Sequence, residues 1–160
     1  MNRKIDLGFE DGDASSSIKS GGTANVVFAK LKDSRLIEKH QVTDVAVKLL
    51  HGNRNTDPEM FESFRYEIAL MSALPESPYL VKLIGFSMDP MAIVMRRYSS
   101  SLQEFLDSSN IFNDDRTRRK AMTEIALGMG LVHSKNIIHF DLKPGTQEPR
   151  SQMIFILCIS

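Results

Sequence analysis

Hydrophobic and polar residues alternate in short blocks over the first hundred positions, and this pattern predicts a sheet interrupted by one helix. The apolar blocks are brief and β-branched, which favours β-structure. They predict strands at 5–9, 26–29, 42–50, 79–85 and 92–95. A turn at Met88-Asp89-Pro90 is predicted to join the last two strands, and the charged segment 32–41 is predicted to be a turn or hairpin tip.

Helical periodicity occurs in two longer segments. In the first, Asp57 can cap the free amides, Pro58 fits the first helical position and Pro75 ends the helix. Its apolar face is formed by Phe61, Phe64, Ile68 and Met71, which recur at helical spacing. The second helix is predicted from 113–115 to Ser134, with its apolar face at Met122, Ile125, Met129 and Val132. With a short helix at 102–106, the order of elements predicts an α+β fold in two lobes.

Composition narrows the class of protein. The chain has 160 residues, of which 42% are hydrophobic and 25% charged, values that are typical of a globular domain. Lys plus Arg and Asp plus Glu both number 20, so no excess of positive charge points to nucleic acid or membrane as a partner. The single cysteine, Cys158, excludes an internal disulfide, and no apolar run reaches the ~20 residues of a membrane span. We therefore expect a cytoplasmic protein.

One lysine and one glutamate are the first candidates for chemistry. Lys48 ends the Val-rich run 45–48, where an ammonium among apolar side chains needs a counterion. Glu67 lies beside the apolar stripe of the first predicted helix. Each residue alone is typical of an ordinary surface position, but a strand lysine paired with a helix glutamate would aim its ammonium at an anionic ligand.

Two further segments suit the binding and transfer of phosphate. Gly21 and Gly22 precede a strand, where small residues let backbone amides approach a phosphate, although most Gly-Gly pairs form simple turns. The string 137–144 places Asp141 and Lys143 two residues apart on a loop before a proline. A carboxylate there can orient a hydroxyl while the lysine stabilises developing charge. The four histidines show no metal-ligand spacing, so no metal site is predicted.

These motifs, in this order, resemble the first part of a eukaryotic protein kinase domain. The family has a glycine-rich loop, a V-A-x-K lysine, a helix glutamate and an H-R-D-x-K-P catalytic loop. The resemblance covers about residues 18–145. It favours a serine/threonine kinase and, within that class, the tyrosine-kinase-like group. It implies four segments: a polar lead-in at 1–17, an N-terminal lobe with hinge at 18–98, a partial C-terminal lobe at 99–145 and a divergent apolar tail at 146–160.

The resemblance also implies a role for each matching residue. Lys48 would hold the α- and β-phosphates of ATP and pair with Glu67, Asp141 would act as the base that receives the substrate hydroxyl, and Lys143 would lie beside the γ-phosphate. Val26 and Ala46 would enclose the adenine ring. The other positions implied around ATP are Lys19, Ser20, Gly21, Gly22, the gatekeeper Met95 and the hinge residues Arg96 and Tyr98. The partners implied are ATP and a protein substrate or a partner kinase.

The sequence departs from the family pattern at four places. Lys19 and Ala24 replace two glycines of the loop, and Phe140 replaces the arginine of H-R-D. Thr146 stands where the family has a magnesium-binding asparagine, and its hydroxyl is a weaker ligand. No Asp-Phe-Gly motif follows in 146–160, so the Mg²⁺ expected for the family lacks its ligands here.

Three hypotheses remain open on the sequence. The chain is an ATP-dependent protein kinase, a pseudokinase-like module that binds a nucleotide or a partner, or a non-functional gene fragment. The seven-residue apolar run 153–159 either replaces a missing strand or comes from a shifted reading frame or an unspliced intron. The missing metal-binding motif predicts a chain that is truncated before Asp-Phe-Gly and inactive as it stands.

Overall fold

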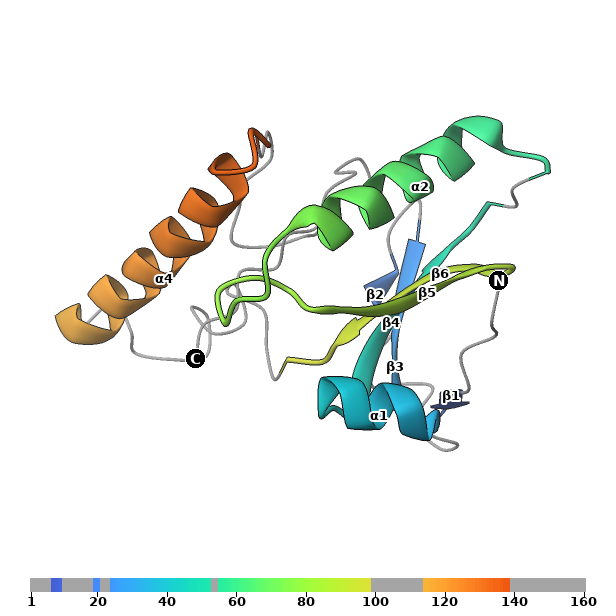
Figure 1. The fold of residues 1–160 in the computed structure, drawn as a ribbon, viewed down its shortest axis with the longest axis horizontal. Helices are drawn as coiled ribbons and strands as arrows, with labels where there is room; N and C mark the ends of the chain where they lie inside the picture. Colours follow the sequence, from blue (N-terminus) through green and yellow to red (C-terminus); the bar gives the residue numbers. More distant parts are fainter. Residues whose placement is uncertain (1–6, 10–18, 21–23, 53–54, 99–113, 139–160) are drawn as a thin grey trace.

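The computed structural model describes residues 7–9, 19–20, 24–52, 55–98 and 114–138. Within these ranges, six strands form one antiparallel sheet in the order β1-β3-β4-β6-β5, and β2 also pairs with β3 (Figure 1). The elements in chain order are β1 (Leu7–Phe9), β2 (Lys19–Ser20), β3 (Ala24–Leu31), α1 (Ser34–His40), β4 (Asp44–Leu50), α2 (Pro58–Ala73), β5 (Leu83–Met88), β6 (Met91–Arg96) and α4 (Asp115–His133). The α+β fold expected from the sequence is confirmed.

The sheet carries an apolar cluster on each of its two faces. The strands β3, β4, β5 and β6 each contribute to both clusters, because side chains alternate between the faces along a strand. In β4, Val45 and Val47 belong to one apolar cluster, against which α1 packs Leu36. Ala46 belongs to a second cluster with Phe64 of α2. Figure 1 shows α1 and α2 on opposite sides of the sheet. The protein therefore has two separate apolar layers, and the layer under α2 contains the candidate site.

The helix α1 corrects the prediction of a turn or hairpin tip at 32–41. Asp33 caps the helix by accepting hydrogen bonds from the backbone N–H groups of Arg35 and Leu36, at 3.1 and 3.3 Å. Leu36 and Ile37 are half-buried against the sheet. This tertiary contact explains the difference, because two adjacent apolar residues in a charged run are too few to show helical periodicity.

The helix α2 confirms the predicted start at Asp57 and Pro58. The Asp57 side chain accepts a hydrogen bond from the Met60 N–H at 3.0 Å, and Pro58 occupies the first turn. Phe64 and Ile68 are buried, and Phe61 and Met71 pack against the same cluster half-buried. The predicted apolar face of this helix is therefore confirmed.

The strand boundaries differ from the predictions mainly before β5. This strand begins at Leu83, whereas a strand was expected from 79. A turn occupies the intervening residues, where the Ser77 Oγ accepts a hydrogen bond from the Tyr79 N–H at 3.1 Å. Leu80 and Val81 are nevertheless buried, so the apolar run marks core packing and not strand pairing. The predicted turn between β5 and β6 is confirmed at Asp89-Pro90.

The helix α4 has the predicted limits but a rotated buried face. Asp114 caps it by accepting from the Arg116 N–H at 3.1 Å. Met122, predicted on the apolar face, is 69% exposed, whereas Val132 is fully buried and Ile125 and Met129 are half-buried. The buried residues of α4 are Ala121, Glu124, Gly128 and Val132. Two of these residues, Ala121 and Gly128, are small, and a periodicity of large apolar side chains does not include them.

Two other observations complete the fold. The predicted helix at 102–106 lies outside the described residues. Among the helices that the structure describes, none has the length and apolar character needed to cross a membrane.

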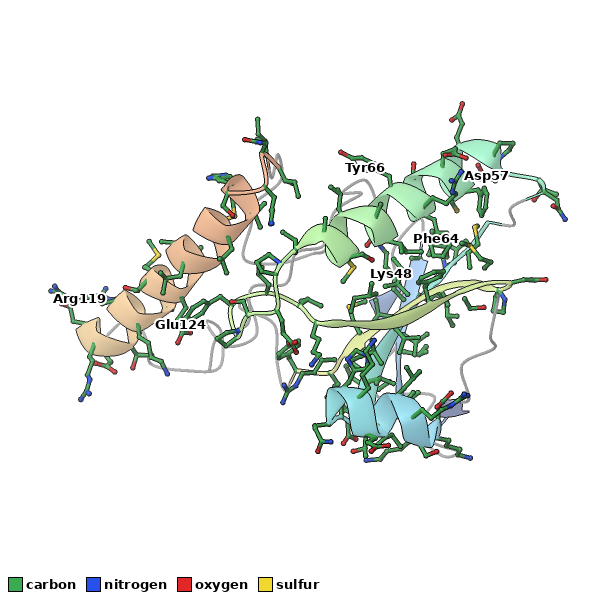
Figure 2. All side chains as sticks on the ribbon, in the orientation of Figure 1. Lys48, Asp57, Phe64, Tyr66, Arg119 and Glu124 are labelled. Carbon is green, nitrogen blue, oxygen red and sulfur yellow. The ribbon has the colours of Figure 1, made fainter. Side chains whose placement is uncertain are left out.

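The packing of α2 predicts unequal effects for two aromatic residues on opposite faces of the helix. Phe64 is fully buried on the side of α2 that faces the sheet, whereas Tyr66 is 60% exposed and projects away from the sheet (Figure 2). We expect Phe64→Ala to lower the free energy of unfolding by about 3–5 kcal/mol, because a cavity replaces the ring. The matched control Tyr66→Ala should change it by less than about 0.5 kcal/mol. Urea unfolding measures both, and equal losses would contradict this assignment of the core.

The environment of His40 predicts a pH-dependent stability. Among the described groups, neither ring nitrogen has a hydrogen-bond partner or contact with solvent. Burial lowers the pKa of His40 below its ordinary value, and the positive charges of Lys39 and Lys82 lower it further, against a smaller opposite effect of Glu76. The unfolded chain therefore binds a proton first as the pH falls below about 6.5.

We expect the free energy of unfolding of the wild type to decrease between about pH 7.5 and about pH 5.5, and His40→Gln to flatten this decrease. The folded protein keeps His40 neutral, and its contribution to the free energy of unfolding is fully present above the pKa of His40 in the unfolded chain. This contribution is lost as the pH falls through the lowered pKa of the folded state. Urea titrations of both proteins at several pH values provide the measurement. Parallel curves for the two proteins would show that His40 does not titrate in this way.

Candidate functional site

The centre of the candidate site is an ion pair between Lys48 of β4 and Glu67 of α2. The Lys48 Nζ donates to both carboxylate oxygens of Glu67, at 2.8 and 2.9 Å. The two residues are only 6% and 7% exposed. Figure 2 shows Lys48 between the sheet and α2, close to Phe64. A lysine that makes two short contacts to a buried carboxylate is held in one position, with its charge compensated.

Local structure accounts for the meeting of these two residues. Lys48 follows Ala46 on the face of β4 that α2 covers, because side chains on a strand alternate. Glu67 lies three residues after Phe64 and directly before Ile68, both buried against the same face. The apolar face of α2 therefore carries Glu67 towards the sheet. The pairing expected from the sequence is present.

The register of three strands gathers the other implied positions around Lys48. Val26 of β3 is directly opposite Lys48, and Ala46 of β4 is directly opposite Met95 of β6. Ala46 and Met95 are buried, at 8% and 4% exposure, and Val26 is half-buried. The Lys48 ammonium thus lies next to small and flexible apolar side chains, an arrangement that suits a ligand with a flat ring and an anionic group.

The segment after β6 carries the implied hinge residues. Arg96 ends β6 opposite Val45, and its side chain is exposed. The Arg96 N–H donates to the Lys82 carbonyl at 3.0 Å, and the Arg97 N–H donates to the Asp44 carbonyl at 3.3 Å. Tyr98 packs against the apolar cluster under α2. This segment is therefore tied to the sheet on both sides, and we refer to residues 96–98 as the hinge.

One contact at this end of the site was not anticipated from the sequence. The Arg97 guanidinium lies over the ring of Phe28, with 4.0 Å between its Cζ and the ring centroid. Phe28 is two residues beyond Val26 in β3 and therefore on the same face. The spacing of Val26 and Phe28 in the sequence predicts that they share a face. The residues next to Arg97 in the sequence do not indicate that Phe28 is its partner.

The remaining predicted site residues are only partly described. Lys19 and Ser20 form β2, which pairs with Val26 and Asn25 of β3. Gly21, Gly22, Asp141 and Lys143 lie outside the described residues. Within the described ranges, no group of three His, Cys, Asp or Glu side chains could hold a metal ion.

The burial of the ion pair predicts a characteristic pattern of stability. Lys48→Met alone should lower the free energy of unfolding by about 3–5 kcal/mol, because it leaves the Glu67 carboxylate buried without a partner. The double variant Lys48→Met with Glu67→Leu should recover most of this loss, because no buried charge remains.

The exposed pair Arg65–Glu62 on the same helix offers a matched control. Its Nη1–Oε1 distance is 3.0 Å, but both side chains are more than half exposed. Replacing both by Ala should change stability by less than about 1 kcal/mol. A double-mutant cycle followed by urea unfolding measures the coupling. Equal coupling in the two pairs would refute the special role of burial.

Comparison with known proteins places this geometry in a family. The model of the protein tyrosine and serine/threonine kinase family matches residues 13–144. A probable serine/threonine-protein kinase of Dictyostelium discoideum is 36% identical over 116 residues, which cover 62% of this chain and 8% of that protein. The serine/threonine-protein kinase pkn2 of Myxococcus xanthus is 30% identical over 109 residues, covering 62% of this chain and 12% of the relative.

A plant protein adds a further match. Integrin-linked protein kinase 1 of Arabidopsis thaliana is 30% identical over 119 residues, covering 71% of this chain and 24% of the relative. The chain thus spans a quarter or less of the length of each of these three proteins. The family match itself extends over most of the chain and includes β3, β4, α2 and the Lys48–Glu67 pair. The chain therefore belongs to the protein tyrosine and serine/threonine kinase family.

Proposed function

We propose that this chain binds ATP in the site formed by β3, β4, β6 and the hinge. The observation that carries the proposal is the buried Lys48–Glu67 pair, with two Nζ–Oε distances below 3 Å. In this proposal Lys48 binds the α- and β-phosphates, and Glu67 holds it in place. The Lys48 ammonium attracts a phosphate more strongly in this buried position than it would at the surface, because little water competes with the phosphate.

The adenine ring occupies the apolar part of the same face. Val26 of β3 is directly opposite Lys48, and Ala46 lies two residues before Lys48 on the same face of β4. Met95 limits the depth of the pocket from β6, and the backbone of Arg96 and Tyr98 meets the edge of the ring. The small side chain at position 46 leaves room for a flat ring, and a larger one would fill that room.

The reaction that the family resemblance implies is phosphoryl transfer from ATP to a serine or threonine hydroxyl of a protein. Asp141 would accept the hydroxyl proton, and Lys143 would stabilise charge near the γ-phosphate. Mg²⁺ would neutralise the transferring group, but the Asp-Phe-Gly aspartate that holds it in the family is not among these 160 residues. For a polypeptide of these residues we propose nucleotide binding without transfer, as in a pseudokinase-like module.

Nucleotide binding predicts a stabilisation by ATP that depends on Lys48. ATP at about a hundred times its dissociation constant should stabilise the wild type by about 2.7 kcal/mol, visible as a rise in melting temperature. The double variant Lys48→Met with Glu67→Leu should lose most of this rise, because it keeps a compensated core but lacks the ammonium.

Replacing the exposed pair Arg65–Glu62 by Ala is the control, and it should leave the ATP-dependent rise unchanged. Isothermal titration calorimetry supplies the affinities independently of melting. If millimolar ATP neither shifts the melting temperature of the wild type nor produces heat, the chain does not bind the nucleotide.

Transfer is tested separately with radiolabelled ATP, Mg²⁺ and a generic protein substrate. We expect the wild type to incorporate no more label than Asp141→Asn, because the metal-binding aspartate is missing. Incorporation by the wild type that disappears in Asp141→Asn would show instead that the 160 residues form an active kinase.

A further inference from the structure

The contact between Arg97 and Phe28 joins the hinge to β3. The guanidinium Cζ lies 4.0 Å from the ring centroid, well within the range in which a cation is attracted to an aromatic face. Both side chains are half-buried, so water weakens the contact less than at a fully exposed site. The contact joins residues 28 and 97, which are 69 positions apart in the sequence.

A second attachment holds the same residue to β4. The Arg97 N–H donates to the Asp44 carbonyl at 3.3 Å. The Asp44 carboxylate pairs with Lys30 of β3 at 2.5 Å, and the pKa of Asp44 is lowered, first by this hydrogen bond and to a smaller extent by the charge of Arg97. Arg97 is therefore held by its side chain to β3 and by its backbone to β4.

These attachments lie beside the positions proposed for the adenine ring. Phe28 is directly opposite Ala46, and Val26 shares its face of β3. Arg97 itself stands between Arg96 and Tyr98, whose backbone is proposed to meet the adenine edge. A side chain that fixes the middle residue of a three-residue hinge also restricts the peptide groups on both sides of it.

We propose that Arg97 is a positioning residue for nucleotide binding, whose stacking on Phe28 clamps the hinge in the conformation that receives adenine. This inference rests on the proposed function. In this proposal Arg97 neither contacts the nucleotide directly nor attracts its phosphates by charge. The clamp acts through the backbone of the residues on either side of Arg97.

The clamp affects affinity through the population of the competent hinge. When only a fraction of molecules has the hinge in place, the apparent dissociation constant rises by the reciprocal of that fraction. A cation–π contact of ordinary strength shifts such an equilibrium by a factor of about 2 to 30. We therefore expect Arg97→Ala to weaken nucleotide binding by about 3- to 20-fold.

The experiment compares three ligands, adenosine, ADP and ATP, by calorimetry on the full chain. A clamp on the adenine end predicts the same fold loss for all three in Arg97→Ala, because they share the ring. Phe28→Leu should produce a similar loss, and the double variant should add little to either, because both changes remove one contact. Phe28→Tyr keeps an aromatic face and should retain the wild-type affinity.

Arg65→Ala is a matched control, because the Arg65 Cζ lies 5.9 Å from the Phe61 ring within α2, away from the hinge. It should leave all three affinities within about twofold, since the cation–aromatic contact that it removes does not involve the hinge. Melting temperatures measured without nucleotide show whether each variant folds. If Arg97→Ala or Phe28→Leu fails to fold, Phe28→Tyr still tests the clamp, because it keeps an aromatic ring of similar volume. An affinity equal to that of the wild type supports the clamp. A large loss of affinity overturns it.

Two further results would overturn the clamp. One is unchanged affinity in Arg97→Ala while the wild type binds ATP. The other is a loss confined to ADP and ATP, which would assign Arg97 to the phosphates by charge. A wild type that binds none of the three ligands would instead overturn the proposed function, so the two failures are distinguishable.

Discussion

The ion pair between Lys48 and Glu67 is the interaction on which the rest of the site depends. Neither charge could remain in this layer alone, because removing an ion from water requires a partner to compensate it. The pair therefore ties the position of α2 to that of β4, in a layer where Phe64 and Ile68 supply the apolar contact. Apolar packing tolerates small rotations of a helix, whereas two Nζ–Oε contacts below 3 Å do not.

The second constraint is the register of the sheet. Val26 faces Lys48 across one strand boundary, and Ala46 faces Met95 across the next. A slip of one residue in either pairing would turn every side chain of that strand to the opposite face, away from α2 and towards α1. Because both faces carry apolar clusters, each strand is held in register by packing on two sides. The helix α1 contributes to the site in this indirect way.

The hinge is attached to the same sheet by contacts of a different kind. It uses backbone hydrogen bonds to Lys82 and Asp44 and the stacking of Arg97 on Phe28. These contacts are individually modest, but together they order a segment that leaves the sheet and would otherwise be free to move. The ion pair and the hinge thus hold the two ends of one face, with the register of β3, β4 and β6 setting the spacing between them.

The sequence alone determined the features that depend on local chemistry. The cap and the apolar face of α2 and the turn before β6 follow from residue type and spacing. The pairing of Lys48 with Glu67 was expected from the resemblance that the motifs of the sequence carry. Only the tertiary structure decided the helix α1, the late start of β5, the exposure of Met122 and the contact of Arg97 with Phe28. The helix α1 and the contact of Arg97 with Phe28 depend on neighbours distant in sequence. Spacing along a chain shows which side chains share a face, but the partner of that face is fixed only when the chain folds back on itself.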